Sequence, residues 1–153
     1  MQKRINPYEI EPNVLRTLRG LGAYLAKSTI DQPLLNLLHF RVSQINGCAH
    51  CLDMHSKDLR AAGETEQRLF LLDAWREASC YTDRERAALA WAEAVTRVAE
   101  TRIPDELYTD TLQYFSDKEL IDLTMAVIMI NCWNRMNVAF RMPVGNYQPA
   151  GAN

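Results

Sequence analysis

Apolar side chains recur at intervals of three and four residues along most of this chain, which is the spacing of one face of an α-helix. The first such stripe follows Pro12 and predicts a helix that runs to about Lys27. The second starts after Asp31, has Pro33 in its opening turn and reaches Ile45. Proline suits the first turn of a helix because the N–H that it lacks would have no partner there. Two amphipathic helices are therefore expected before residue 46.

Start and stop signals predict the remaining helices. Gly63 can supply the left-handed residue after a helix, and Thr65 can cap the short helix that follows. Two reciprocal capping boxes, each with glutamate three residues after Ser or Thr, can open two longer helices. These boxes are Thr82 with Glu85 and Ser116 with Glu119. The helices expected beyond residue 46 are about 48–62, 66–75, 83–100, 104–115 and 117–140.

The segment 117–140 is apolar around most of its circumference, so it should lie in the core or between subunits. No window shows the sustained two-residue alternation of a half-buried strand, and no linker or repeat divides the chain. The sequence therefore predicts an all-α fold. It should be a single-domain helical bundle of about six to seven helices over residues 1–153.

Composition narrows the class of protein. With 48% hydrophobic and 24% charged residues, a chain of 153 residues can build a full globular core. Its net charge of −2 comes from interspersed charges, without the basic stripe that a nucleic-acid-binding protein needs. No apolar run resembles a secretory signal, and the longest one, residues 123–133, is too short to span a membrane. We expect a cytoplasmic protein with no nucleic-acid or membrane partner.

The candidate chemistry lies in Cys48, Cys51 and His55, which form a C-x-x-C-x-x-x-H cluster. Offsets of three and four residues place the three side chains on one face of a helix. The reactive form of cysteine is the thiolate, whose pKa falls near a helix N-terminus or beside an imidazole. The helix dipole favours Cys48, the position of His55 favours Cys51, and Asn46 can cap the free N–H groups of the helix. We expect at least one thiol of lowered pKa, and in a reducing compartment a catalytic pair rather than a permanent crosslink.

Three other interpretations of the cluster were weighed. A structural zinc site needs four ligands, and no second Cys or His pair accompanies these three, so no metal is expected. Covalent haem attachment needs a histidine directly after the second cysteine, where Leu52 stands. Two buried structural cysteines beside a hydrogen-bonded histidine form an alternative that spacing alone does not exclude.

The residues around the cluster resemble a known family. The run Ser43–Lys57, followed by Ala61–Glu64, is similar to the core of the alkylhydroperoxidase D-like (AhpD-like) proteins of the carboxymuconolactone decarboxylase-like superfamily. The later segments Trp75–Ala78 and Thr82–Trp91 are similar to its short, single-domain members. The resemblance covers about residues 10–145. It implies an all-helical fold, a homotrimer or homohexamer, and thiol-dependent peroxidase or disulfide reductase activity.

The resemblance also implies a role for each residue of the cluster. Cys51 matches the thiolate that attacks peroxide, and Cys48 matches the thiol that condenses with the sulfenic acid to a Cys48–Cys51 disulfide. His55 would accept the proton of Cys51. An external thiol reductant, often a lipoyl-bearing protein in this family, would restore the pair, so no bound cofactor is implied. The expected substrates are small hydroperoxides or disulfides.

The chain departs from the family pattern at Asn36, where a glutamate of the proton relay commonly stands. Asparagine does not titrate near neutral pH. His39, three residues further along the same helix, could replace the carboxylate, although an exposed or packing histidine is the more ordinary role. Glu93 is a second candidate but falls on a polar stripe of its helix, so we expect it to face solvent. His50, on a different face from the cysteines, is also expected to be exposed.

The loss of the glutamate keeps two further function classes open. A non-catalytic binding or assembly module could keep the scaffold and lose turnover. A lyase of the lactone decarboxylase type would share the fold, but its chemistry gains nothing from a C-x-x-C pair. The sequence favours a thiol-dependent oxidoreductase over both.

Overall fold

In the computed structural model of the chain, which describes residues 2 and 4–149, all regular secondary structure is helical. The helices are α1 (Pro7–Ile10), α2 (Pro12–Leu25), α3 (Gln32–Ile45), α4 (Ala49–Ala61), α5 (Glu66–Leu71), the 3₁₀ turn η1 (Leu72–Ala74), α6 (Asp83–Thr96), α7 (Val98–Thr101), α8 (Asp105–Leu112) and α9 (Asp117–Phe140). The predicted all-α fold is confirmed. Two short helices, α1 and α7, raise the number above the predicted six to seven.

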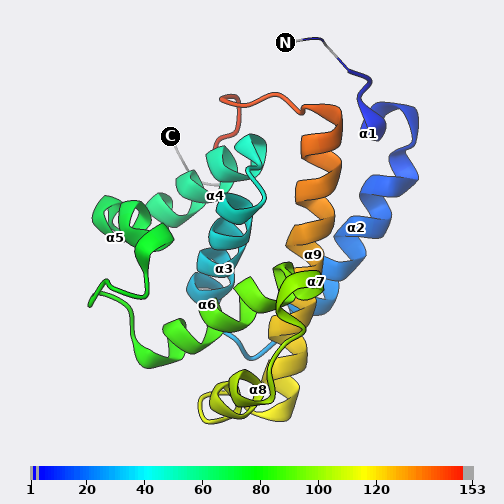
Figure 1. Cartoon of the computed structure of the whole chain (residues 1–153). Coiled ribbons are helices and arrows are strands. Elements are labelled where there is room, and N and C mark those ends of the chain that lie inside the picture. The colour runs from blue at the N-terminus through cyan, green and yellow to red at the C-terminus, as the bar shows by residue number, and fades with distance from the viewer. Residues whose placement is uncertain (1, 3, 150–153) are drawn as a thin grey trace.

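The long helix α9 is the centre of the bundle (Figure 1). It contacts α2, α3, α4, α6 and α8, so most of its circumference is covered by other helices. Its side chains Leu123, Val127 and Ile130 are almost fully buried. The capping box of Ser116 and Glu119 opens it as predicted. The apolar character of residues 117–140 thus reflects a core helix, as the sequence indicated.

Helix α3 packs on both α4 and α9 and carries the chain to the candidate site. Asp31 caps it, since its carboxylate accepts a hydrogen bond of 2.9 Å from the N–H of Leu34. Leu37, Leu38 and Val42 are buried in the core. Because α3 is fixed on two sides, the turn at its C-terminal end is held in place.

The helix predicted over residues 83–100 is divided in two. Its backbone leaves helical geometry at Arg97, with φ −104° and ψ 37°, and α7 follows as a separate turn. The Thr101 hydroxyl donates a hydrogen bond of 2.9 Å to the carbonyl of Ala94, across the break. A hydroxyl that takes up a carbonyl near the end of α6 favours this early stop.

Glu93 corrects a prediction, because it is 7% exposed rather than on a solvated face. Its carboxylate accepts hydrogen bonds from Arg41 Nε at 2.8 Å, Trp75 Nε1 at 2.9 Å and Arg76 at 2.6 Å. Burial opposes ionisation, yet these three donors hold the pKa of Glu93 below its usual range. The periodicity of α6 could not reveal donors that come from α3 and from the loop after η1.

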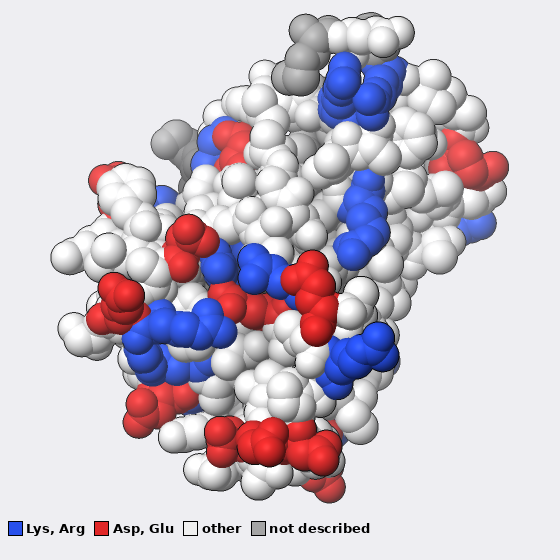
Figure 2. Space-filling view, viewed as in Figure 1, with Lys and Arg blue, Asp and Glu red and all other residues white. Residues whose placement is uncertain are grey.

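Charges of both signs are interspersed over most of the face in Figure 2. Lys and Arg gather at the top of that view, near the N-terminal residues and the end of α9. Within residues 2 and 4–149, no helix combines the length and the apolar character needed to cross a membrane.

Candidate active site

The candidate site begins with a tight turn between α3 and α4. Only Asn46, Gly47 and Cys48 separate the two helices. Gly47 has φ +63°, a left-handed conformation that costs glycine little. Cys48 is extended and acts as the N-cap of α4, where its Sγ accepts the N–H of Cys51 at 3.4 Å. The turn therefore places one cysteine at the cap and the other in the first turn of α4.

Asn46 does not cap α4, contrary to expectation. It ends α3, and its side-chain amide donates to Asn131 Oδ1 at 3.0 Å and to Asn134 Oδ1 at 2.9 Å. The capping position falls two residues later because the left-handed Gly47 turns the chain before α4 starts. Asn46 instead attaches the turn to α9.

Cys51 is the thiol with a lowered pKa, at about 6. The largest cause is a hydrogen bond from the thiol of Cys48, and the amide of Asn137 donates a second one at 3.3 Å. Burial acts in the opposite direction but is outweighed. The positive end of the α4 dipole also faces this first turn. Cys51 is therefore mostly a thiolate at neutral pH.

Cys48 has the opposite character. Its pKa is raised, because its S–H donates to Cys51 and because it is buried. Both cysteines are free thiols in this structure, and each is at most 1% exposed. The pair is thus a protonated thiol that donates to a neighbouring thiolate, and the pKa values belong to the pair as a whole.

Asn137 and Tyr8 complete the surroundings of the thiolate, and the sequence analysis missed both. The Tyr8 hydroxyl donates to Asn137 Oδ1 at 2.9 Å, which leaves the amide N–H of Asn137 to point at Cys51 Sγ. Burial, followed by the charge of Cys51, raises the pKa of Tyr8 to about 12, so the phenol keeps its proton. Tyr8 of α1, near the N-terminal end of the chain, therefore helps to orient the amide that donates to the thiolate.

A signal for these residues is present in α9. Asn131, Asn134 and Asn137 recur every third residue in a helix that is otherwise apolar, and each uses its amide on another helix or on its own turn. Asn134 donates to Ser43 Oγ at 3.0 Å, which ties α9 to α3 below the turn. Buried amides are costly without partners, so a regular row of them marks a polar network.

His55 and His39 lie together, but neither is a charged relay group. Their ring centroids are 5.2 Å apart with an interplanar angle of 44°. Burial lowers the pKa of His55 to about 4, and burial together with His55 lowers that of His39 to about 3. Both nitrogens of His55 and Nε2 of His39 have no hydrogen-bond partner among the described residues. The two imidazoles are neutral, and His55 makes no hydrogen bond to Cys51.

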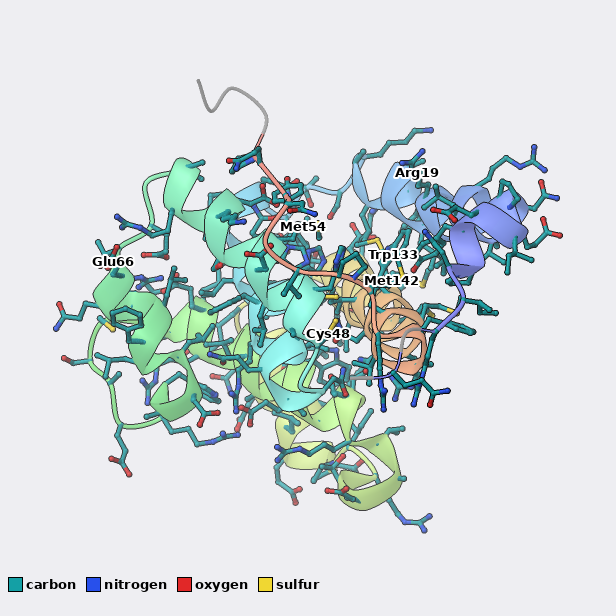
Figure 3. All side chains as sticks on the ribbon, turned by 90° about the horizontal axis from the view of Figure 1, so that it is seen from above. Arg19, Cys48, Met54, Glu66, Trp133 and Met142 are labelled. Carbon is teal, nitrogen blue, oxygen red and sulfur yellow. The ribbon has the colours of Figure 1, made fainter. Side chains whose placement is uncertain are left out.

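A cavity of about 530 Å³ contains Cys51 at its floor; we call it the apolar cavity. Most of its walls are apolar or aromatic, and Arg19 is its one exposed lining residue. Figure 3 shows Met54 on α4, Trp133 on α9 and Met142 after α9 near one another, with Arg19 on α2 beyond them. The full lining is Tyr8, Leu15, Arg19, His39, His50, Cys51, Met54, His55, Met129, Ile130, Trp133, Asn137 and Met142. Its size and character suit a small organic molecule.

The structure does not bring Asn36 to this site. Asn36 is half-buried, accepts a hydrogen bond from Gln32 at 2.8 Å and does not line the apolar cavity. His50 was expected to be exposed but is half-buried, because the segment after α9 crosses it. Its Nδ1 lies 2.6 Å from the carbonyl oxygen of Pro143. His50 lines the apolar cavity and slightly favours the thiolate of Cys51.

No set of three or more His, Cys, Asp or Glu side chains within residues 2 and 4–149 is arranged to hold a metal ion.

Comparisons with known proteins place these features in a wider context. The sequence pattern of the Carboxymuconolactone decarboxylase family matches residues 12–94. The uncharacterised protein YdfG of Bacillus subtilis is 40% identical over 139 residues, covering 91% of this chain and 95% of YdfG. A crystal structure of a protein of unknown function from Agrobacterium tumefaciens, suggested to be the antioxidant defence protein AhpD, superposes with a TM-score of 0.91. It is 39% identical and covers 95% of this chain and 100% of its own. The alkyl hydroperoxide reductase AhpD of Nocardia farcinica is 46% identical over 41 residues, which are 27% of this chain and 23% of that protein.

Proposed function

Because the chain belongs to the carboxymuconolactone decarboxylase family, we propose that it is an AhpD-like thiol peroxidase that reduces small hydroperoxides with Cys51 and Cys48. One observation carries the proposal: a buried thiolate at the floor of an organic cavity has a protonated thiol donating to it. This is the arrangement that a two-cysteine peroxidase needs before it meets its oxidant. The likeness to AhpD proteins supports the same chemistry.

The proposed reaction uses the two thiols in sequence. The thiolate of Cys51 attacks the terminal oxygen of the hydroperoxide, the O–O bond breaks, and the alkoxide leaves and takes up a proton to become an alcohol. Cys51 is then a sulfenic acid. Cys48, the adjacent thiol, attacks its sulfur, releases water and forms the Cys48–Cys51 disulfide. Two electrons have passed from the dithiol to the peroxide.

This scheme changes the role expected for His55. Cys51 does not need a base at neutral pH because its pKa is already about 6. A neutral imidazole has one N–H donor and one free nitrogen acceptor. The ring of His55 lines the apolar cavity, and its buried nitrogens have no partner among the described residues, so a rotation of the ring would let it hold the oxygen atoms of the hydroperoxide and donate to the alkoxide as it leaves. His39 would act through its contact with His55 rather than in place of the missing glutamate.

The proposal includes an external thiol reductant and assembly into a homotrimer or homohexamer, both implied by the family. No bound cofactor is required. A binding module on the same scaffold and a decarboxylase-like lyase are the competing functions. Neither has a use for a cavity-lining thiolate that is paired with a second thiol.

Peroxide consumption in the presence of a dithiol tests the proposal. Cys51→Ser should abolish turnover, and Cys48→Ser should stop after one equivalent and leave a sulfenic acid that a dimedone probe captures. Cys80→Ser is the control, because Cys80 is an exposed thiol on a loop between η1 and α6. If Cys51→Ser consumes peroxide as fast as the parent, the proposed function is wrong. Slow, irreversible loss of thiols in the parent would favour a binding module or a lyase.

A further inference from the structure

The dithiol lies between two separate hollows. Cys51 lines the apolar cavity, and Cys48 does not. Cys48 lines a second hollow of about 400 Å³, on the side of the α3–α4 turn and the end of α9; we call it the open hollow. Asn137, His50 and Met142 line both, so the two hollows adjoin at these residues. The two sulfur atoms are thus approached from different sides.

The two hollows differ in exposure. In the apolar cavity only Arg19 is an exposed residue, so the walls that a ligand meets there are mostly buried or half-buried side chains. Six residues of the open hollow are exposed, and the wall is mostly aliphatic or glycine. These six are Gly47, Ala49, Val138, Arg141, Pro143 and Val144. Walls of buried side chains suit a small free substrate, whereas a rim of exposed residues can also meet a group that is attached to a larger carrier.

We propose that the open hollow is the reductant site, where the thiolate of an external dithiol attacks the sulfur of Cys48 in the oxidised pair. This inference rests on the proposed function only in requiring that Cys48 and Cys51 form a disulfide. It assigns oxidation to one hollow and reduction to the other. Substrate and reductant would then not compete for one entrance.

The direction of attack follows from the geometry of thiol–disulfide exchange. The incoming sulfur, the sulfur attacked and the leaving sulfur lie nearly in line, so an attack on Cys48 must come from the side away from Cys51. Of the two hollows, only the open hollow is lined by Cys48 and not by Cys51, so it is the one from which we expect such an attack. An attack on Cys51 would have to come through the apolar cavity instead.

The hydrogen bonds at the site favour Cys51 as the leaving group, which agrees with an attack on Cys48. When the Cys48–Cys51 bond breaks, the electron pair goes to Cys51 as a thiolate, where the N–H of Asn137 already points. Cys48 is joined to the reductant as a mixed disulfide. The second thiol of the reductant then gives up its proton to solvent and attacks the first sulfur of the reductant, which is bonded to Cys48. Cys48 leaves and takes a proton, which restores the thiol that donates to Cys51, and the reductant departs as a disulfide.

Charge at the rim of the open hollow indicates which thiols enter it most readily. Among the described residues, Arg141 is the one Lys, Arg, Asp or Glu residue that lines the open hollow, and it also lines a neighbouring surface depression with Arg4 and Glu9. The guanidinium of Arg141 donates to the backbone carbonyl of Gln2, which leaves its positive charge uncompensated in that contact. An anionic thiol carrier should therefore react faster than a neutral one of the same size.

The first test separates the two half-reactions. Oxidised protein is prepared with diamide, so that no peroxide is needed. It is then reduced with dithiothreitol, samples are quenched with acid at intervals, and the new free thiols are alkylated and counted by mass. Val144→Trp narrows the open hollow and should slow reduction about tenfold or more, or about 1.4 kcal/mol in activation free energy. The control is Val98→Trp on α7, since Val98 is 53% exposed and Val144 52%. Leu15→Trp, which narrows the apolar cavity, should slow oxidation by cumene hydroperoxide and not reduction.

The second test locates the attacked sulfur in the parent protein and then measures the effect of charge. Oxidised protein is mixed with 2-mercaptoethanol, quenched with acid within the first turnover and digested, and the adduct is mapped by mass. The adduct should be on Cys48. The rate with 2-mercaptoethanesulfonate should exceed that with 2-mercaptoethanol, and Arg141→Gln should remove the difference.

The outcomes separate this inference from the proposed function. An adduct on Cys51, or reduction that Val144→Trp leaves unchanged, would overturn the reductant site even if the protein consumes peroxide. An adduct on Cys48 in a protein that ignores every hydroperoxide would support the reductant site and overturn the peroxidase.

Discussion

Asn137 allows the origin of the low thiol pKa to be tested by a single substitution. Asn137→Leu keeps a side chain of similar size and removes the N–H that lies 3.3 Å from Cys51 Sγ. A hydrogen bond to a charged group stabilises by about 1.5–3 kcal/mol, and one pKa unit corresponds to about 1.4 kcal/mol. Sulfur is a weak acceptor, so the lower end of that range applies and the pKa of Cys51 should rise by about one unit. At neutral pH the thiolate fraction would then fall from about 90% to about 50%.

The assay does not depend on turnover. The rate at which iodoacetamide alkylates Cys51, resolved by peptide mass, follows the thiolate fraction, so its midpoint in pH gives the pKa. The parent should have a midpoint near pH 6. Tyr8→Phe should shift the midpoint in the same direction by less, because Tyr8 only orients the amide. Asn131→Leu is the control: Asn131 lies on the same helix and makes no hydrogen bond to Cys51, but its amide bonds Thr96, a carbonyl of its own helix and Asn46 of the turn.

An unchanged midpoint in Asn137→Leu, with folding verified by circular dichroism, would refute the amide contribution. The low pKa would then depend on the thiol of Cys48 and the helix dipole alone. An equal shift in Asn131→Leu would show that any disturbance of the α9 network acts on the thiolate, and that the direct contact has no special role.

Three further predictions concern buried or displaced polar groups. His39 and His55 have a lower pKa in the folded chain than in the unfolded one, so the unfolded chain takes up protons first as the pH falls. Between neutral pH and about pH 5, each histidine should therefore lower the unfolding free energy by about 2 kcal/mol. Urea unfolding at several pH values measures this loss, and His39→Phe should remove about half of it. Glu93→Gln should lower the unfolding free energy by about 3 kcal/mol, because the buried Arg41 loses its buried counter-charge and keeps only the exposed carboxylate of Asp73; a loss below about 1 kcal/mol would argue that water and Asp73 replace the Glu93 carboxylate. Asn36→Glu should leave peroxide consumption unchanged, because Asn36 does not line the apolar cavity, and a clear rate increase would show a proton path that the structure does not reveal.

Local signals were sufficient for the helices but not for the electrostatics of the site. The prolines that open α2 and α3 and the two capping boxes act within one turn of chain, so the sequence carried them directly. Glu93 was placed on the surface because its partners come from other parts of the chain. The donors to Cys51 were missed for the same reason, since Asn137 is 86 residues away from it. Periodicity reports which face of a helix is apolar, but it does not report which polar groups another helix supplies.

The two histidines support the proposed use of the apolar cavity on energetic grounds. Buried polar atoms almost always have partners, and a buried donor or acceptor without one costs about 1–3 kcal/mol. Three such ring nitrogens occur together here, on His39 and His55, beside the cavity that holds the Cys51 thiolate. Two packed apolar side chains would fill the same space without this cost. A ligand with both acceptor and donor oxygens, such as a hydroperoxide, would offset this cost if the rings turn their buried nitrogens toward the apolar cavity.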